Sequence, residues 1–474
     1  MANEKYKLGM IGLGTMGRNL LLNMADHGFA VSGYDRDITK IEILTTEGEG
    51  KPVKGFASIK DFVNSLDSPR AIMMLVPAGK AVDAVINELE PLLTKGDIII
   101  DGGNSHFTDT TLRVKSLSEK GFHFFGMGVS GGEEGARKGP SMMPGGDKAA
   151  YQYVLPVLEA IAAQADGMPC VAYIGPGSSG HFVKMVHNGI EYALMQLISD
   201  TYEILKKGLR FTNPQIQKVF SDWNKGRLQS YLLEITSNIF GFKENGAEQF
   251  LIDVIKDEAR SKGTGKWTTQ VSTDLELPIP TIDLAVAMRN LSKYKSLRSE
   301  VAVMYHDDES IAAIKDAPAY LVQLEEAYYF SMIMIYSQGM QLFSKASVEF
   351  GYELKLHEIA RIWKGGCIIR AAFLEIIHQG YEANPNLPHL ILNEQVQKII
   401  KETAPSMRKV VSGMVSSGTS IPCYANALSY FDALRSENMP SNLIQAQRDY
   451  FGAHTYEMIG KEGSFHSQWN VVLD

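Results

Sequence analysis

Hydrophobic and polar positions change their spacing near residue 175. Before it, short continuous apolar runs alternate with helical stretches; after a glycine- and serine-rich break at residues 175–180, the 3.6-residue period of helices takes over. The apolar runs predict buried, mostly parallel strands at residues 8–11, 30–35, 71–76, 98–101, 123–125 and 170–174. We therefore expect an α/β domain at residues 1–178, a large all-α domain at residues 179–440 and a C-terminal tail at residues 441–474.

A glycine-rich hexapeptide follows the first predicted strand and opens a helix. It has the G-x-G-x-x-G spacing of a Rossmann-like dinucleotide site: Gly12, Leu13, Gly14, Thr15, Met16 and Gly17. Gly12 permits the tight turn, Gly14 lets a pyrophosphate approach the backbone, and Gly17 allows close helix packing. The hexapeptide alone is a weak signal, but its position between a strand and a helix predicts a dinucleotide site at the helix N-terminus.

The acidic end of the second predicted strand bears on the choice of dinucleotide. Asp35 can accept hydrogen bonds from adenosine ribose hydroxyls and repel a 2′-phosphate, which favours NAD. Arg36 could instead bind a 2′-phosphate, whereas Asp37 adds further negative charge. The local negative charge favours NAD as the cofactor, whereas Arg36 leaves NADP as an alternative.

Two further glycine-rich loops follow predicted strands, at residues 101–105 and 129–136. Ligands of such sheets bind beyond the carboxyl ends of the strands, where these loops lie. Simple tight turns are the alternative, but the neighbouring hydroxyl and amide side chains favour a site for an anionic or hydroxylated substrate. We interpret residues 141–146 as a turn.

The stretch at residues 180–192 predicts an apolar helix with one polar face. Lys184, Asn188 and Glu191 are spaced i, i+4 and i+7, so they share one stripe of a helix that is otherwise buried nearly all round. Burying an amine or a carboxylate costs desolvation free energy, so such groups usually form an ion pair or take part in catalysis. The stripe is either a structural Lys–Glu pair or solvated edge, or a proton-transfer face with His187 and Asn188 as positioning neighbours.

The helical part contains a weak internal repeat and several isolated basic residues. Residues 219–226 resemble residues 359–366, and each segment follows a long apolar helix. The basic residues with a chemical interpretation are Lys262 and Lys266 in a Gly/Thr loop, Arg289 on an apolar helix, and Arg448 and His454 in the tail. Each could form an ordinary ion pair or bind an anion. The tail beyond Leu443 lacks a helical pattern, so we expect it to lie on another surface, such as that of a partner subunit.

Composition excludes several classes of protein. The 474 residues include 45% hydrophobic residues and carry a net charge of −8, which argues against a nucleic-acid or anionic-membrane surface. The three cysteines are far apart and lack metal spacing, so we expect a reducing cytoplasm, no disulfide framework and no metal site. Residues 1–7 lack a signal-peptide core, and no apolar run is long enough to span a membrane.

Together these motifs resemble one family over essentially the whole chain. The dinucleotide loop, the two glycine-rich loops, residues 180–191, residues 262–267 and the tail from Arg448 to His454 are similar to the decarboxylating 6-phosphogluconate dehydrogenases of the β-hydroxyacid dehydrogenase superfamily. The resemblance implies an enzyme of the pentose phosphate pathway that oxidises 6-phosphogluconate to ribulose 5-phosphate and CO2 and reduces NADP. It also implies a homodimer whose tails cross between subunits.

The resemblance assigns a role to each candidate residue. Lys184 is implied as the general base at the C3 hydroxyl and Glu191 as the acid that protonates C1. No metal is needed, because the 3-keto group accepts the electrons of the departing carboxylate. Val76 and Asn104 join the cofactor site. The substrate residues implied are Asn104, Ser130, Gly131, Gly132, His187 and Asn188 at the sugar acid, Tyr192, Lys262, Thr264, Arg289 and Arg448 at the phosphate, and His454 from the partner's tail.

The sequence departs from the family pattern at the cofactor site. The family usually has Asn-Arg-Ser/Thr where this chain has Asp35, Arg36 and Asp37, and a lysine where it has Pro77. These departures oppose a 2′-phosphate, so we hypothesise dual or NAD-leaning use. Two other functions remain as alternatives: a sister β-hydroxyacid dehydrogenase acting on an unphosphorylated acid, and a catalytically silent cofactor-binding protein.

Overall fold

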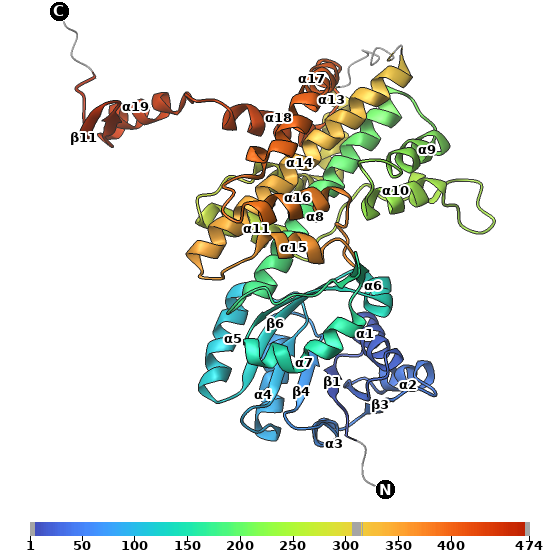
Figure 1. Cartoon of the computed structure of the whole chain (residues 1–474). Coiled ribbons are helices and arrows are strands. Elements are labelled where there is room, and N and C mark those ends of the chain that lie inside the picture. Colours follow the sequence, from blue (N-terminus) through green and yellow to red (C-terminus); the bar gives the residue numbers. More distant parts are fainter. Residues whose placement is uncertain (1–4, 306–313, 315, 470–474) are drawn as a thin grey trace, which may run out of the picture.

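The computed structural model describes residues 5–305, 314 and 316–469, so part of the N-terminal stretch considered above lies outside the described residues. An α/β domain forms one end of the molecule, a bundle of long helices packs against it, and a tail extends away from the bundle (Figure 1). The predicted fold class, a Rossmann-like domain followed by a mostly helical domain and a tail, is confirmed.

The N-terminal sheet has seven strands in the order β3-β2-β1-β4-β5-β6-β7. Neighbouring strands are parallel except β6 and β7, which are antiparallel. The carboxyl ends of β1 and β4 therefore lie side by side at the point where the strand order reverses, which is where such sheets bind ligands. The strands are β1 (Leu8–Ile11), β2 (Val31–Tyr34), β3 (Val53–Phe56), β4 (Ala71–Met74), β5 (Ile98–Asp101), β6 (His123–Ser130) and β7 (Ser141–Gly146).

Two strand assignments from the sequence were wrong. Residues 141–146 form β7, paired with β6 along its whole length, and are not a turn. Residues 170–174 are not a strand: they run beside β7 with a single bridge between Val171 and Met142. The Ile174 N–H donates to the Pro144 carbonyl at 2.8 Å, but Pro144 has no N–H to donate in return, so a regular ladder cannot form.

Helices cover both faces of the sheet. One core lies under α1, α2, α6 and α7, and a second lies on the other face under α3, α4 and α5, so the central strands are buried on both sides. The helices are α1 (Thr15–Asp26), α2 (Ile38–Glu47), α3 (Ile59–Asn64), α4 (Lys80–Leu89), α5 (Phe107–Glu119), α6 (Gly132–Lys138) and α7 (Lys148–Ile161).

The helical part is built on two long helices packed together, α8 (Ser179–Glu203) and α14 (Ala317–Glu349). Each is followed by a short helix, a turn and another short helix, and these two segments meet at a bridge between Ser230 and Ala371. The remaining helices are α9 (Asn213–Trp223), α10 (Tyr231–Gly241), α11 (Thr264–Asp274), α12 (Pro280–Ser292), α13 (Lys295–Met304), α15 (Leu356–Ile362), α16 (Phe373–Ala383), α17 (Glu394–Ser416) and α18 (Pro422–Leu434).

The tail differs from the prediction, because it contains a helix. It consists of α19 (Ser441–Gly452) and a hairpin of β10 (Tyr456–Met458) and β11 (Lys461–Phe465), and it lies apart from the rest of the chain (Figure 1). The buried Asp449 carboxylate fastens helix to hairpin, accepting hydrogen bonds from Thr455 N at 3.0 Å, Ser467 N at 3.1 Å and Trp469 Nε1 at 2.8 Å. The apolar side chains of α19 are exposed in its own chain, among them Leu443, Ile444 and Phe451.

Neither a membrane-spanning helix nor a cluster of metal ligands occurs among the described residues. None of the helices there is long and apolar enough to cross a membrane. No group of three or more His, Cys, Asp or Glu side chains within residues 5–305, 314 and 316–469 is arranged to hold a metal ion.

Candidate active site

The glycine-rich turn between β1 and α1 has the geometry that a dinucleotide requires. Gly12 has a φ of +94°, and a Cβ on it would lie 2.5 Å from the Leu75 carbonyl oxygen. A Cβ on Gly17 would lie 1.9 Å from the Gly12 carbonyl oxygen, so α1 packs directly on the turn. Gly14 faces open space, with nothing within 4 Å of an added Cβ. The turn therefore leaves its backbone accessible at the N-terminus of α1, as pyrophosphate binding needs.

The other predicted cofactor residues surround this turn or support it. A cavity of about 360 Å³ is lined by Gly12, Gly14, Asp35, Arg36 and Val76, together with Pro77 and Glu88. Leu13 points into the core, whereas Thr15 and Met16 form the first turn of α1. Asn104 lies exposed in the loop after β5. A dinucleotide thus fits the residues present at this edge of the sheet.

Asp35 and Asp37 both have structural partners. The Asp35 carboxylate accepts hydrogen bonds from Leu13 N at 2.8 Å and Asp37 N at 2.9 Å and lies 3.4 Å from Lys40 Nζ. Burial alone raises the pKa of Asp35, but these hydrogen bonds and Lys40 outweigh it and lower the pKa. Asp37 caps α2 by accepting a hydrogen bond from Thr39 N at 3.0 Å. Asp35 therefore remains an anion at the ribose end of the cavity.

The central helix α8 lies very close to the β6–β7 hairpin. A Cβ on Gly128 of β6 would lie 2.4 Å from the Cβ of Lys184. Similarly, a Cβ on Gly180 would lie 2.3 Å from the Met143 carbonyl oxygen. Small residues on both elements allow this approach, which puts Lys184 against the carboxyl end of β6. The prediction of a helix buried nearly all round is confirmed, since every residue from Ser179 to Ile190 is buried.

Lys184 and Glu191 are two acid–base groups whose pKa values burial moves towards each other. Burial lowers the pKa of Lys184 and outweighs the attraction of Glu191. Burial also raises the pKa of Glu191 and outweighs the attraction of Lys184 and Arg289. Both side chains lie in the described part of the chain, and no ion pair joins them there. The arrangement therefore favours the proton-transfer interpretation of the polar stripe over a structural pair.

His187 connects the polar stripe to the glycine-rich loop after β6. It is fully buried, and burial followed by the neighbouring Lys184 charge holds its pKa well below 6.5, so the ring is neutral. Its Nδ1 lies 3.1 Å from Asn188 Oδ1, which can only accept, so Nδ1 carries the proton. Its Nε2 therefore accepts, from Ser130 Oγ at 3.2 Å and from Cys367 Sγ at 3.2 Å.

The segment around Gly366 completes this side of the site and was missed by sequence reasoning. Gly131 has a φ of +115°, and a Cβ on it would lie 2.6 Å from the Gly366 carbonyl oxygen. Gly132 also has a positive φ, so the Ser130-Gly131-Gly132 turn is a glycine-dependent structure. Burial raises the pKa of Cys367 to about 12, which keeps it a thiol donor beside His187. The similarity of residues 359–366 to residues 219–226 was the only sign of this segment in the sequence.

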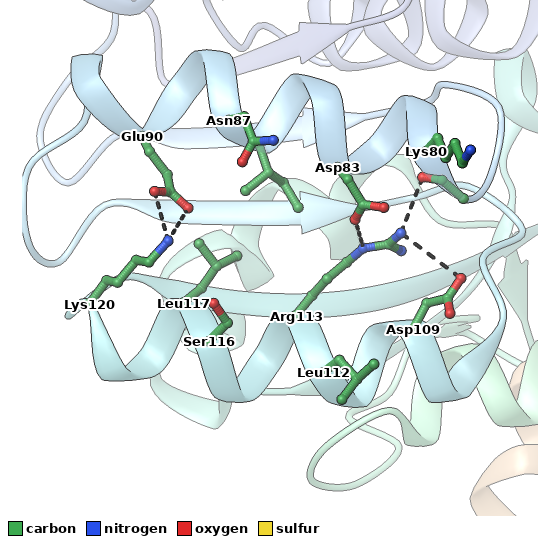
Figure 2. Close-up of a pocket in the computed structure, with 12 residues that line it drawn as sticks. Lys80, Asp83, Asn87, Glu90, Asp109, Leu112, Arg113, Ser116, Leu117 and Lys120 are labelled. Atoms are coloured by element: carbon green, nitrogen blue, oxygen red, sulfur yellow. Dashed lines mark hydrogen bonds and ion pairs between the residues drawn. The ribbon is translucent and has the colours of Figure 1, made fainter.

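A second hydrogen-bond network holds the loop after β5. The Asp101 carboxylate accepts hydrogen bonds from Ser105 Oγ at 2.6 Å and Gly103 N at 3.0 Å, and the Asp101 carbonyl lies 3.0 Å from His181 Nε2 of α8. Arg113 lies beneath this loop and donates to Asp83 at 2.7 Å and to the Gly79 carbonyl at 3.2 Å (Figure 2). The network fixes the loop that carries Asn104 relative to both α4 and α8.

The residues expected at the phosphate gather around the N-terminus of α11. Thr264 begins this helix and its Oγ1 accepts a hydrogen bond from Asn188 Nδ2 at 3.2 Å. Arg289 stacks on the Tyr192 ring, with its guanidinium carbon 3.7 Å from the ring centroid, and donates to the Arg260 carbonyl at 3.1 Å. Lys262 is exposed just before the helix. A helix N-terminus with cations beside it favours an anion.

Arg448 and His454 do not lie at the site of their own chain. Both are exposed residues of the tail, whose helix α19 lies away from α8 (Figure 1), and Arg448 donates a hydrogen bond to Gln445 Oε1 at 3.1 Å. A single chain therefore brings together the predicted residues of α8, the two loops and α11, but not those of the tail.

Comparison with known proteins explains this constellation. A family model described as the NAD binding domain of 6-phosphogluconate dehydrogenase matches residues 7–175, and one described as the C-terminal domain of 6-phosphogluconate dehydrogenase matches residues 180–469. The chain belongs to the 6-phosphogluconate dehydrogenase family. The resemblance of the motifs to this family is thereby confirmed.

Individual 6-phosphogluconate dehydrogenases match over nearly their whole length. The NADP(+)-dependent decarboxylating enzyme of Bacillus subtilis is 48% identical over 98% of this chain and 99% of its own. The decarboxylating enzyme of Escherichia coli is 46% identical over 98% and 99%. A Plasmodium falciparum 6-phosphogluconate dehydrogenase, solved in its apo form and in complexes with NADP+ and with 6-phosphogluconate, has a TM-score of 0.95 and 43% identity over 98% of this chain and 100% of its own.

Proposed function

We propose that the protein catalyses the oxidative decarboxylation of 6-phospho-D-gluconate to D-ribulose 5-phosphate and CO2 with reduction of NADP, as an enzyme of the pentose phosphate pathway. The observation that carries this proposal is the buried amine of Lys184 and the partly buried carboxyl group of Glu191 on α8, in a chain that matches decarboxylating relatives over 98% of its length. A binding protein needs no such pair of acid–base groups with opposed pKa shifts.

Lys184 is the general base of the oxidation. Its lowered pKa makes the neutral amine accessible, and this amine removes the proton of the C3 hydroxyl. A dinucleotide held at the β1–α1 turn beside Gly14 would supply the acceptor for the hydride that leaves C3. The resulting 3-keto group accepts the electron pair released when the C1 carboxylate leaves as CO2, so no metal is required. The ammonium of Lys184, now protonated, donates to the ketone oxygen during this loss.

Glu191 supplies the last proton. Because its pKa is raised by burial, a larger fraction of Glu191 is protonated than for an exposed carboxyl group. Glu191 protonates the enediol carbon that was C2 of the substrate and becomes C1 of ribulose 5-phosphate, while Lys184 takes back the proton of the C3 hydroxyl as the ketone forms. His187, held neutral between Asn188 and Ser130, orients the substrate hydroxyls without adding a competing charge. Asn104 and the Ser130-Gly131-Gly132 turn contact the sugar acid.

The phosphate of the substrate binds at the N-terminus of α11. Tyr192, Lys262, Thr264 and Arg289 supply the donors within one chain, and the polarity of the helix favours the anion. We assign the remaining contacts, from Arg448 and His454, to the tail of a partner subunit. This assignment is supported by the exposure of both residues away from their own chain's site.

A homodimer with exchanged tails accounts for the apolar surface of the chain. Exposed apolar side chains occur on the tail, where Leu443 is 61% and Phe451 72% exposed, and on α13 and α14, where Val303 is 81% and Val322 58% exposed. Burying such surfaces against a second copy is favourable. The pathway and the three free, buried cysteines are in keeping with a cytoplasmic enzyme.

Purified protein supplied with 6-phosphogluconate and NADP should release one CO2 for each cofactor reduced, measured by coupling a CO2 assay to absorbance at the reduced nicotinamide band. With gluconate in place of 6-phosphogluconate, kcat/KM should fall by at least about a hundredfold, because the α11 site loses its charge-assisted contacts. Equal use of both acids would instead indicate a sister hydroxyacid dehydrogenase, and no reduction with either would indicate a silent binding protein.

The enzyme should also use NAD. Asp35 stays ionised at the ribose end of the cavity, and Pro77 contributes no charge there, so the site lacks the full set of cations that a 2′-phosphate prefers. We expect the ratio of kcat/KM with NADP to kcat/KM with NAD to lie below about one hundred. Steady-state kinetics with each cofactor at saturating 6-phosphogluconate measures this ratio, and a larger preference for NADP would rule the hypothesis out.

A further inference from the structure

The adenosine end of the cofactor cavity contains a carboxylate that the family motifs do not include. Glu88 lies near the C-terminus of α4 and lines the cavity together with Asp35, Arg36, Lys40 and Pro77. It comes from a different element than the loop after β2, which carries Asp35 and Arg36. Its position in the chain gave no sign of this role, because Glu88 lies in an ordinary amphipathic helix.

Glu88 forms an ion pair with Arg36, through its Oε1 and the arginine Nη2. Lys40, the other cation that lines the cavity, lies 3.4 Å from the Asp35 carboxylate. Each of these two cations therefore already has a carboxylate partner. The side chain of Arg36 is 66% exposed and that of Glu88 39% exposed, so the pair is accessible to a ligand and to solvent.

An ion pair at this point affects the two dinucleotides differently. The 2′-phosphate of NADP carries about two negative charges and needs Arg36, so it must displace Glu88 and then lie near the released carboxylate. The 2′-hydroxyl of NAD is neutral and can donate to Asp35 while Arg36 stays bound to Glu88. The pair therefore opposes NADP binding and leaves NAD binding largely unaffected.

We propose that Glu88 is a specificity-determining residue for the dinucleotide, acting as a competitor for Arg36 that lowers the preference for NADP relative to NAD. The proposal rests on the proposed dehydrogenase function, since it concerns the cofactor of that reaction. It deepens that function by assigning part of the cofactor choice to α4, outside the loop after β2.

Glu88→Gln should raise the ratio of kcat/KM with NADP to that with NAD by about threefold to tenfold at low salt, because the variant frees Arg36 and removes a repelling charge. The increase should shrink as ionic strength rises. Binding provides a second measurement without catalysis: affinity for 2′,5′-ADP should increase by a similar factor, whereas affinity for 5′-ADP should stay unchanged, which also shows that the variant is folded.

The chain offers a matched control in Glu90→Gln. Glu90 follows α4 and is likewise in an ion pair, with Lys120 Nζ at 2.6 Å, but it faces the groove between α4 and α5 (Figure 2). This variant changes the net charge by the same amount as Glu88→Gln. It should leave unchanged both the ratio of kcat/KM with NADP to that with NAD and the affinity for 2′,5′-ADP. In an Arg36→Gln background, Glu88→Gln should have a smaller effect, because only the repulsion between Glu88 and the 2′-phosphate then remains to be removed.

The outcomes separate this proposal from the proposed function. An unchanged or lower preference for NADP in Glu88→Gln, or an equal change in Glu90→Gln, would overturn the role of Glu88 while leaving the dehydrogenase intact. If the unmodified protein oxidised 6-phosphogluconate with neither cofactor, the proposed function would fail; the binding of 2′,5′-ADP and 5′-ADP would still test Glu88.

Discussion

Lys184→Met should lower kcat by about 10²- to 10⁴-fold, the usual contribution of a general base, while 6-phosphogluconate still binds. Methionine keeps the apolar stem that packs against Gly128 but cannot accept a proton. The phosphate donors at α11 are untouched, so the dissociation constant, measured by calorimetry, should change little. Single-turnover cofactor reduction should be slowed as much as kcat, because hydride transfer itself needs the base. Normal turnover by this variant would remove Lys184 from the mechanism.

Glu191→Gln is the matched control on the same face of α8. It should leave single-turnover cofactor reduction nearly intact and slow ribulose 5-phosphate formation, because Glu191 acts after hydride transfer. The pH dependence should also differ. Turnover needs a neutral Lys184 for hydride transfer and a protonated Glu191 after the loss of CO2, so kcat in the unmodified enzyme should rise and then fall with pH. The glutamine variant should lose the fall at high pH, and an unchanged bell-shaped profile would argue against Glu191 as the acid.

Much of the α/β domain could be predicted because its central strands are continuous apolar runs. The edge strand β3 was missed, since its exposed Lys54 and its Gly55 give neither an apolar run nor a clear alternation. The interpretation of residues 141–146 as a turn failed for a different reason. Gly145 is there because α8 passes close to it: a Cβ on Gly145 would lie 2.2 Å from Gly180 N. The glycine is needed for close helix packing, and the local sequence cannot distinguish such a glycine from one that is needed for a turn.

The candidate site could be predicted where its residues share one element. Lys184, Asn188 and Glu191 are readable from helical spacing alone, and the structure buries Lys184 and Asn188 as expected. Cys367 and Gly366 could not be found in this way, because they reach His187 and Gly131 from a segment far along the chain. Glu88 likewise meets Arg36 only through the fold. Contacts between distant elements leave no periodic signal in either segment.

Arg448→Met should lower kcat/KM for 6-phosphogluconate by about a hundredfold, because the substrate phosphate loses a charge-assisted partner. The side chain is exposed in its own chain, and Asp449 holds the tail together as a small unit, so the substitution should not unfold the protein. The loss should appear mainly in KM. The same variant also allows a direct test of tail exchange.

Co-expression of Lys184→Met and Arg448→Met chains should restore activity that neither variant has alone, when the rate is measured at a 6-phosphogluconate concentration well below the KM of Arg448→Met. In a mixed dimer, the chain that keeps Lys184 receives an intact tail from its partner, so one of its two sites is complete. With random pairing, half of the dimers are mixed, and about a quarter of the unmodified activity should return. Pairing Lys184→Met with a chain that carries both substitutions leaves no complete site and should restore nothing. If purified mixed dimers of the two single variants stayed inactive, each tail would complete the site of its own chain, and the proposal of exchanged tails would be wrong.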